Sequence, residues 1–166
     1  MGANHRLLDL GRIRIPAFVS REVASFVVPS EDSIAAVRIG KRPSRKSLGQ
    51  SISSAVKAWA ESVASEFGAT KIADATECMI FGNVYEHNDG NEWLLDGQRF
   101  VFLHVVVSGR ATLCFPGVKD ASRRTVEMRK GRVFAFDPRV NHAVVDAQRF
   151  GVRTIGLAVA LDNKAA

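Results

Sequence analysis

The segment Arg99-Phe-Val-Phe-Leu-His-Val-Val-Val107 and its continuation Ser108-Gly109-Arg-Ala-Thr-Leu-Cys-Phe-Pro116 decide the fold class. Two short apolar runs joined by a turn signal that contains glycine are typical of a β-hairpin. The same pattern continues on both sides of this segment, in candidate strands at 75–86, 124–129, 132–137, 142–146 and 151–160. Many short strands joined by tight turns predict an antiparallel sandwich or barrel.

A helical pattern precedes most of these strands. Residues 47–67 carry apolar side chains at steps of three and four, and Gly68 follows where a helix is expected to end. A shorter helix is expected from Ser20, as its capping residue, through Val27. Residues 29–46 are rich in Ser, Gly, Pro and basic side chains and are expected to form mainly a loop. The expected fold class is therefore mainly β with N-terminal helices, in which an amphipathic helix buttresses the barrel.

Length and composition predict one domain. The chain has 166 residues and is 46% hydrophobic, which suits a single domain over 1–166, with 1–70 as the buttress and 71–162 as the barrel core. It contains no apolar run long enough to span a membrane and no apolar signal core at its N-terminus, so we expect a cytoplasmic protein without a membrane partner. Cys78 and Cys114 lack metal-binding or disulfide spacing and are expected to be small buried residues.

The net charge of +6 is distributed unevenly. Basic side chains concentrate in two runs, at 38–46 and 119–132, whereas 73–96 contains acidic residues and no Lys or Arg. The basic runs permit a nucleic-acid-binding module, but such runs usually form solvated surfaces, and these lack interleaved aromatic residues for base stacking. Nucleic acid is therefore not the favoured partner.

The acidic stretch contains a candidate metal site. If 83–87 is extended, Tyr85 and His87 share one face, and the following turn can bring the carboxylate of Asp89 beside His87. His142 comes 55 positions after His87, behind a proline-containing turn, and can approach from the opposite sheet. Two histidines and one carboxylate are the ligand set of non-haem Fe(II) oxygenases. Taken singly, His-x-Asp is a weak signal that most often marks a surface turn.

A further residue extends this pattern. His87-x-Asp89, then His142, then Arg153 eleven positions later resembles the Fe(II)- and 2-oxoglutarate-dependent oxygenases. The segment Ile15-Pro-Ala-Phe18-Val-Ser-Arg-Glu22 is similar to the entry segment of their prolyl-hydroxylase-like branch. The surroundings are similar too, since a glycine-containing strand at 131–138 leads to His142. The resemblance implies a jelly-roll barrel, also called a double-stranded β-helix.

The resemblance also implies roles for these residues. His87, Asp89 and His142 would bind Fe(II), and the guanidinium of Arg153 would hold the distal carboxylate of 2-oxoglutarate. Tyr85 would either donate its hydroxyl to the cosubstrate or be a core tyrosine. With O2, such an enzyme hydroxylates a C–H bond of a small-molecule or peptidyl substrate and converts 2-oxoglutarate to succinate and CO2. Asp89 points to hydroxylation, because related halogenases carry a small residue there.

Other interpretations stay open. The segments 82–92 and 131–142 also resemble the two motifs of cupins, which would give a metal-dependent enzyme or a small-molecule-binding protein without 2-oxoglutarate. A cupin normally has histidine where this chain has Asp89. Conversely, the oxygenase family often has Ser or Thr two residues after the arginine, whereas this chain has Ile155.

Three features remain beside the proposed site. The chain is short and has few loop residues that could cover the open end of the barrel. A homodimer partner, a large substrate or the basic loop 38–46 is therefore expected to close that end. His104 lies in an apolar strand and is expected to be a buried histidine hydrogen-bonded within the sheet rather than a ligand. Trp93 either flanks the substrate entrance or anchors the surface.

Overall fold

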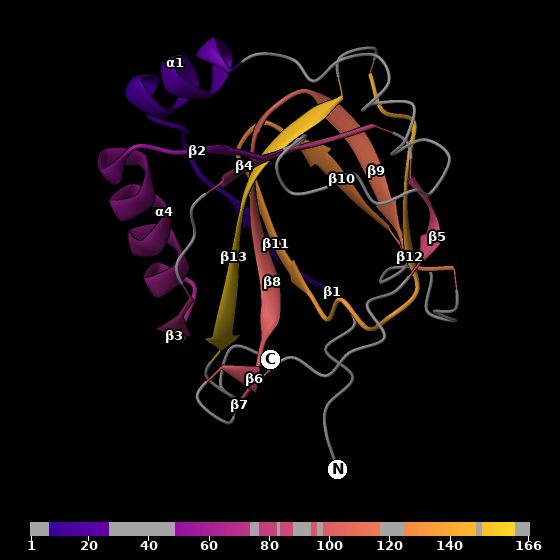
Figure 1. Cartoon of the computed structure of the whole chain (residues 1–166). Coiled ribbons are helices and arrows are strands. Elements are labelled where there is room, and N and C mark those ends of the chain that lie inside the picture. Colours follow the sequence, from indigo (N-terminus) through magenta and orange to yellow (C-terminus); the bar gives the residue numbers. More distant parts are fainter. Residues whose placement is uncertain are drawn as a thin grey trace.

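The computed structural model describes residues 7–26, 49–73, 77–82, 84–87, 94–95, 98–116, 125–148 and 151–161. Within these ranges the chain is mainly β, with two helices beside a curled antiparallel sheet (Figure 1). This confirms the mainly β class with N-terminal helices. No helix of the described part is long and apolar enough to cross a membrane.

The larger sheet forms the centre of the molecule. Its strands follow the order β1-β11-β8-β13-β4-β2, and β3 pairs with the far end of β13. All of its described pairings are antiparallel. The strands are β1 (Leu7–Arg12), β2 (Gly49–Ser51), β3 (Ala69–Ile72), β4 (Glu77–Phe81), β8 (Val101–Ser108), β11 (Arg132–Phe136) and β13 (Val152–Leu161).

A smaller antiparallel sheet lies against one end of the larger one (Figure 1). Its order is β10-β9-β12-β5, so β5 is an edge strand with β12 as its described neighbour. The strands are β5 (Val84–His87), β9 (Arg110–Cys114), β10 (Thr125–Arg129) and β12 (His142–Val145). A separate two-stranded pairing joins β6 (Leu94–Leu95) and β7 (Gln98–Arg99).

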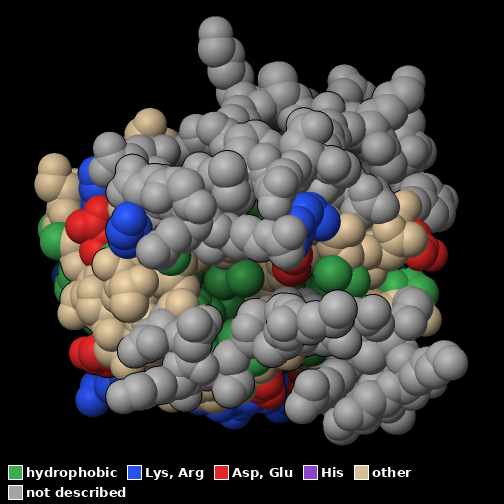
Figure 2. All heavy atoms as spheres, turned by 90° about the horizontal axis from the view of Figure 1, so that it is seen from below, with side chains coloured by type: hydrophobic (Ala, Val, Ile, Leu, Met, Phe, Trp, Pro, Cys, Tyr) green, Lys and Arg blue, Asp and Glu red, His purple; other side chains and the backbone are tan. Residues whose placement is uncertain are grey.

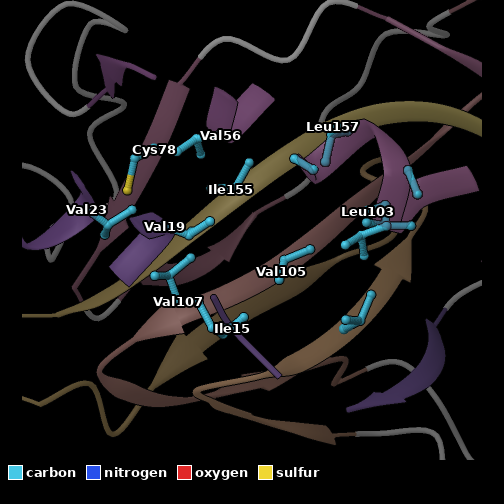
Figure 3. Close-up of a cluster of buried hydrophobic side chains, with 14 of the residues drawn as sticks. Ile15, Val19, Val23, Val56, Cys78, Leu103, Val105, Val107, Ile155 and Leu157 are labelled. Atoms are coloured by element: carbon cyan, nitrogen blue, oxygen red, sulfur yellow. The ribbon is translucent and has the colours of Figure 1, made fainter. Parts of the chain in front are cut away.

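The larger sheet is buried on both faces. Alternate residues of β11 show this, because Phe134 and Phe136 pack between the two sheets whereas Val133 and Ala135 pack toward the helices. The helix-side cluster also contains side chains of α1, α4, β8 and β13 (Figure 3). Two-sided burial explains why 101–107 reads as a continuous apolar run rather than an alternation of apolar and polar residues.

The helix starts differ from the expectation. Helix α1 spans Ala17–Ser25 with Pro16 as the N-cap, so the expected start at Ser20 and end at Val27 were wrong. Ser20 lies inside the helix, and its backbone N–H donates to the carbonyl of Pro16 at 3.1 Å. Proline suits a helix start because its missing N–H has no intrahelical partner there in any case.

Helix α4 spans Ser54–Glu66, which confirms the helix expected within 47–67 but not its first turn. Residues 49–51 form β2 instead, and Ser53 is the N-cap whose hydroxyl accepts the N–H of Val56 at 3.3 Å. Gly68 follows the helix with a φ of +89°, as expected for a helix stop. The side chains of Val56 and Ala60 are fully buried against the larger sheet.

Side chains of both signs of charge lie on the described surface. Figure 2 shows the molecule from below, with Lys and Arg side chains next to Asp and Glu side chains and with hydrophobic side chains between them. Arg132 donates to the Asp9 carboxylate at 3.2 Å on the larger sheet, and Arg110 lies 2.7 Å from Glu127 on the smaller one. The described surface therefore carries charges of both signs, whereas the basic loop 38–46 and residues 119–124 of the second basic run lie outside the described residues.

A glycine substitution tests the close approach of two loops. Gly109 follows β8 with a φ of +81°, and a Cβ there would lie 2.3 Å from the carbonyl oxygen of Gly151. Gly11 has a φ of +99° but open space around the missing Cβ. Because both variants share the cost of a positive φ, Gly109→Ala should lower the free energy of unfolding by at least about 2 kcal/mol more than Gly11→Ala. Urea denaturation measures both, and equal losses would show that this contact relaxes without cost.

Candidate metal centre

The structure brings His87 and His142 together across the smaller sheet. They are direct partners in the antiparallel pairing of β5 with β12. The imidazole of His142 is buried between the sheets, with ring centroids 4.8 Å from Phe136 and 6.2 Å from Phe115. Directly opposed residues of an antiparallel pair lie on the same face. Position 87 is therefore on the face of the smaller sheet that is turned toward the larger one.

The tautomer of His142 follows from its hydrogen bond. Nδ1 lies 2.7 Å from the carbonyl oxygen of Val140. A carbonyl oxygen only accepts, so Nδ1 carries the proton, and the neutral form of His142 has its lone pair on Nε2. Metal-bound histidines commonly donate the second ring nitrogen to a carbonyl or carboxylate in this way. His142 is thus oriented as a metal ligand would be.

The turn before His142 holds that carbonyl in place. Asp137 accepts the backbone N–H of Arg139 at 2.9 Å through Oδ1, and its own carbonyl accepts the N–H of Val140 at 3.1 Å. The guanidinium of Arg139 also pairs with the Asp137 carboxylate. These contacts close a tight turn, and the turn presents the Val140 carbonyl to His142.

The other residues expected at or beside the site divide into two groups. Tyr85 lies in β5 two positions before His87, as expected from the extended reading of 83–87. Asp89 and Trp93 lie outside the described residues. Among the side chains that the structure describes, no three His, Cys, Asp or Glu groups gather in a way that would hold a metal. The pairing of positions 87 and 142 is therefore the part of the proposed ligand set that the structure describes.

Arg153 does not face this centre. In β13, Val152 packs between the two sheets and Thr154 bonds to His104 there, whereas Ile155 belongs to the helix-side cluster. The guanidinium of Arg153 points to the helices, where Nη1 donates to the carbonyl of Val23 at 2.5 Å and reaches that of Phe26 at 3.5 Å. These carbonyls end helix α1. Arg153 thus caps a helix C-terminus, a favourable place for a cation.

The surroundings of Cys78 agree with this placement. Burial raises the pKa of the Cys78 thiol to about 12, the positive charge of Arg153 partly opposes this rise, and the negative charge of Glu22 adds to it. Cys78 is fully buried, as expected, and Cys114 is half-buried. Burial also raises the pKa of Cys114. Neither thiol has the lowered pKa of a reactive cysteine.

His104 is a buried histidine bonded within the sheet, as expected. Its Nδ1 lies 3.1 Å from the hydroxyl of Thr154, and its ring stacks on Phe134 and Phe136 at centroid distances of 5.3 and 5.6 Å. Burial, with a smaller contribution from the nearby His142, lowers its pKa to about 4. His104 is therefore neutral at physiological pH.

Sequence reasoning missed Thr154 as an inward-facing residue. The signal was present in the side-chain sizes along β13. Ile155, Leu157 and Val159 alternate with the small residues Gly156, Ala158 and Ala160. Arg153 is an even number of positions from the large residues, which pack toward the helices.

Comparisons with protein-family models, curated proteins and solved structures found no match to this chain.

The buried His104 gives a pH-dependent stability. Its folded pKa of about 4 lies below the ordinary value of 6.5, so the unfolded chain binds more protons between these values. The buried neutral His104 thus makes its full contribution to the free energy of unfolding above pH 6.5. That contribution falls by up to about 3 kcal/mol as the pH drops to 4. The double variant His104→Leu/Thr154→Val removes both hydrogen-bond partners, and its unfolding free energy should fall less steeply across this window. Urea titrations at several pH values measure this difference. If wild type and the double variant lose stability equally between pH 6.5 and 4, the lowered pKa of His104 is contradicted.

Arg153→Ala separates a structural role from a cosubstrate role. Loss of the bonds to the end of α1 should lower the free energy of unfolding by about 1–3 kcal/mol. The exposed pair of Arg132 with Asp9 supplies the control, and Arg132→Ala should cost less than about 1 kcal/mol. Denaturation measures stability, and calorimetry measures binding of 2-oxoglutarate, which should not change in Arg153→Ala. Unchanged stability with lost 2-oxoglutarate binding would show that Arg153 is the anchor after all.

Proposed function

We propose that this chain is a metal-dependent oxidoreductase with a non-haem Fe(II) centre on His87, Asp89 and His142. One observation carries the proposal. Positions 142 and 87 are directly opposed in the pairing of β12 with β5, and the Nδ1 bond of His142 to the Val140 carbonyl fixes the ring in an orientation typical of metal-bound histidines. Asp89, two residues after His87, would complete a 2-His-1-carboxylate set, which leaves coordination positions open for substrates.

The proposed barrel is a jelly roll, that is, a double-stranded β-helix. Its support is the relation between the two strand orders, β11-β8-β13-β4 in the larger sheet and β10-β9-β12-β5 in the smaller. Strands in the same place of the two orders follow one another among these eight strands along the chain. The four pairs are β10 with β11, β8 with β9, β12 with β13, and β4 with β5. The chain therefore crosses repeatedly between facing sheets, which is how a double-stranded β-helix winds. Ends of strands from both sheets then meet at one mouth.

The chain's own residues would bind and orient the metal and exclude water. Phe115, which follows β9 of the smaller sheet, and Phe136 of β11 in the larger sheet flank His142 and are buried, so apolar side chains from both sheets would shield the centre from water. Low local polarity strengthens the interactions of a bound cation with its ligands. A bound Fe(II) would supply the activation of O2 for oxidation of a C–H bond.

Two versions of this chemistry differ in the cosubstrate. The spacing of His87, Asp89 and His142 supports a 2-oxoglutarate-dependent hydroxylase. The position of Arg153 favours the second version, a cupin-type metal enzyme or binding protein, because that version requires no carboxylate anchor on β13. A hydroxylase of this chain needs a carboxylate anchor other than Arg153. The geometry therefore supports the metal centre in both versions and gives no support to 2-oxoglutarate bound through Arg153.

Anaerobic titration tests the metal centre first. The wild-type protein should bind one equivalent of Fe(II), and His87→Ala, Asp89→Ala and His142→Ala should each weaken binding at least about 10-fold. His5→Ala is a control because His5 has no place in the proposed set. Wild-type protein that stays folded and binds no Fe(II) would overturn the proposal.

Addition of 2-oxoglutarate to the Fe(II)-loaded protein then separates the two versions. A hydroxylase should develop the weak visible charge-transfer band of the bound oxo acid, and the band should disappear in Asp89→Ala. A protein that binds Fe(II) but develops no such band with 2-oxoglutarate would match the cupin-type version.

A further inference from the structure

A hydrogen bond links the two residues that immediately precede the paired histidines. The amide Nδ2 of Asn141 donates to Oε1 of Glu86 at 2.9 Å. Both side chains are exposed, and they come from segments 55 residues apart in the chain. The contact therefore ties β5 to the turn that leads into β12.

This bond lies on the opposite face from the histidine pair. Successive residues of a strand point to opposite faces, so Glu86 is on the outer face when position 87 is on the inner one. Glu86 and Asn141 thus meet outside, while positions 87 and 142 pair inside. Two contacts on opposite faces control both the separation and the rotation of two strands more tightly than one.

The local pairing needs such a tie. Strand β5 is four residues long and, among the described strands, lies at an edge of the smaller sheet. Its register with β12 shifts between His142 and Val144, directly after the histidine pair. Short edge strands beside a register irregularity are the least firmly specified parts of a sheet. The distance between the two histidines therefore depends on contacts beyond the regular ladder.

We propose that Asn141 and Glu86 are positioning residues, which hold β5 against β12 so that His87 and His142 reach one metal ion together. This inference rests on the proposed metal centre. Neither residue binds the metal. Their effect passes through the two histidines, in the way that outer hydrogen bonds commonly set the affinity of a metal site.

A rival explanation assigns Glu86 a purely electrostatic effect. Its negative charge would attract a cation whether or not Asn141 is present. The two explanations differ in what Gln does at position 86. Glutamine keeps a carbonyl oxygen that accepts from Asn141 but removes the charge.

The test is titration of the apo protein with Co(II), followed through its visible absorption bands. Asn141→Ala and Glu86→Ala should each weaken Co(II) binding about 10-fold, whereas Glu86→Gln should stay close to wild type. The double variant Asn141→Ala/Glu86→Ala should bind no more weakly than the weaker single variant, because both single changes remove the same contact. The shape of the bands reports ligand geometry and should change in the Ala variants.

Glu127→Ala is the matched control. It removes the same charge from a half-buried carboxylate of the same sheet, which lies on β10 and pairs with Arg110 of β9 rather than lying beside the histidines. It should leave Co(II) affinity unchanged. Thermal unfolding of every variant without metal separates a positioning effect from a loss of fold, and an exposed hydrogen bond should shift the midpoint only slightly.

The outcomes are distinct. Wild-type affinity in Asn141→Ala would overturn the inference, and so would equal losses in Glu86→Gln and Glu86→Ala. If the Co(II) affinity of the variants falls only in proportion to their thermal stability, the contact has a structural role only. That result would also overturn the inference. If wild-type protein itself binds no Co(II) or Fe(II), the proposed metal centre fails, and that result differs from every pattern in which wild type binds and the variants do not.

Discussion

The pairing of β8 with β13 at the centre of the larger sheet is the interaction on which the other elements depend. Both strands bury side chains on both faces, toward the helices on one side and toward the smaller sheet on the other. Leu103, Val105 and Leu157 are fully or almost fully buried on the helix side. Each such side chain contributes about 1.5–3 kcal/mol through burial. A slip of one residue would exchange the two faces, so the two different environments specify the register strongly.

That constraint also decides which side chains approach the proposed site. Because successive residues of β13 alternate between the two faces, Thr154 faces His104 between the sheets and Arg153 faces α1. A charged guanidinium between the sheets would need partners there, and the described interior offers stacked aromatic rings around a neutral histidine. At the end of α1 it finds carbonyl oxygens instead. The charge thus lies where the helix dipole favours it.

The sequence predicted much of this arrangement. The apolar runs at 99–107, 110–116, 132–137, 142–146 and 151–160 correspond to β8, β9, β11, β12 and β13 within a few residues. Strands β2 and β3 were not expected, because they are short and lie at the two ends of a strong helical pattern. The opposition of His87 and His142 matches the expectation that the two come together, although it arises by direct pairing of neighbouring strands rather than by approach from an opposite sheet.

The direction of Arg153 could not be predicted from spacing. The distance from His142 along the chain places the residue on the next strand, but it says nothing about which face the side chain occupies. Alternation of polar and apolar residues normally supplies that information, and a strand buried on both faces has little of it. The sequence does contain an alternation of large and small residues after position 153. This alternation indicates the direction of Arg153 only once the structure shows that the large residues pack toward the helices.

The proposed metal pair joins a strand at the edge of the smaller sheet to its described neighbour. Strand β5 is an edge strand, and its described pairing is with β12 alone. A metal ion bound by both histidines would join these two strands directly. Since a ligand that binds only the folded state stabilises that state, metal binding and the pairing of β5 with β12 would support each other. The outer bond of Asn141 with Glu86 then acts on the same strand pair from the opposite face, so a modest exposed contact can influence metal affinity more than it influences the stability of the whole fold.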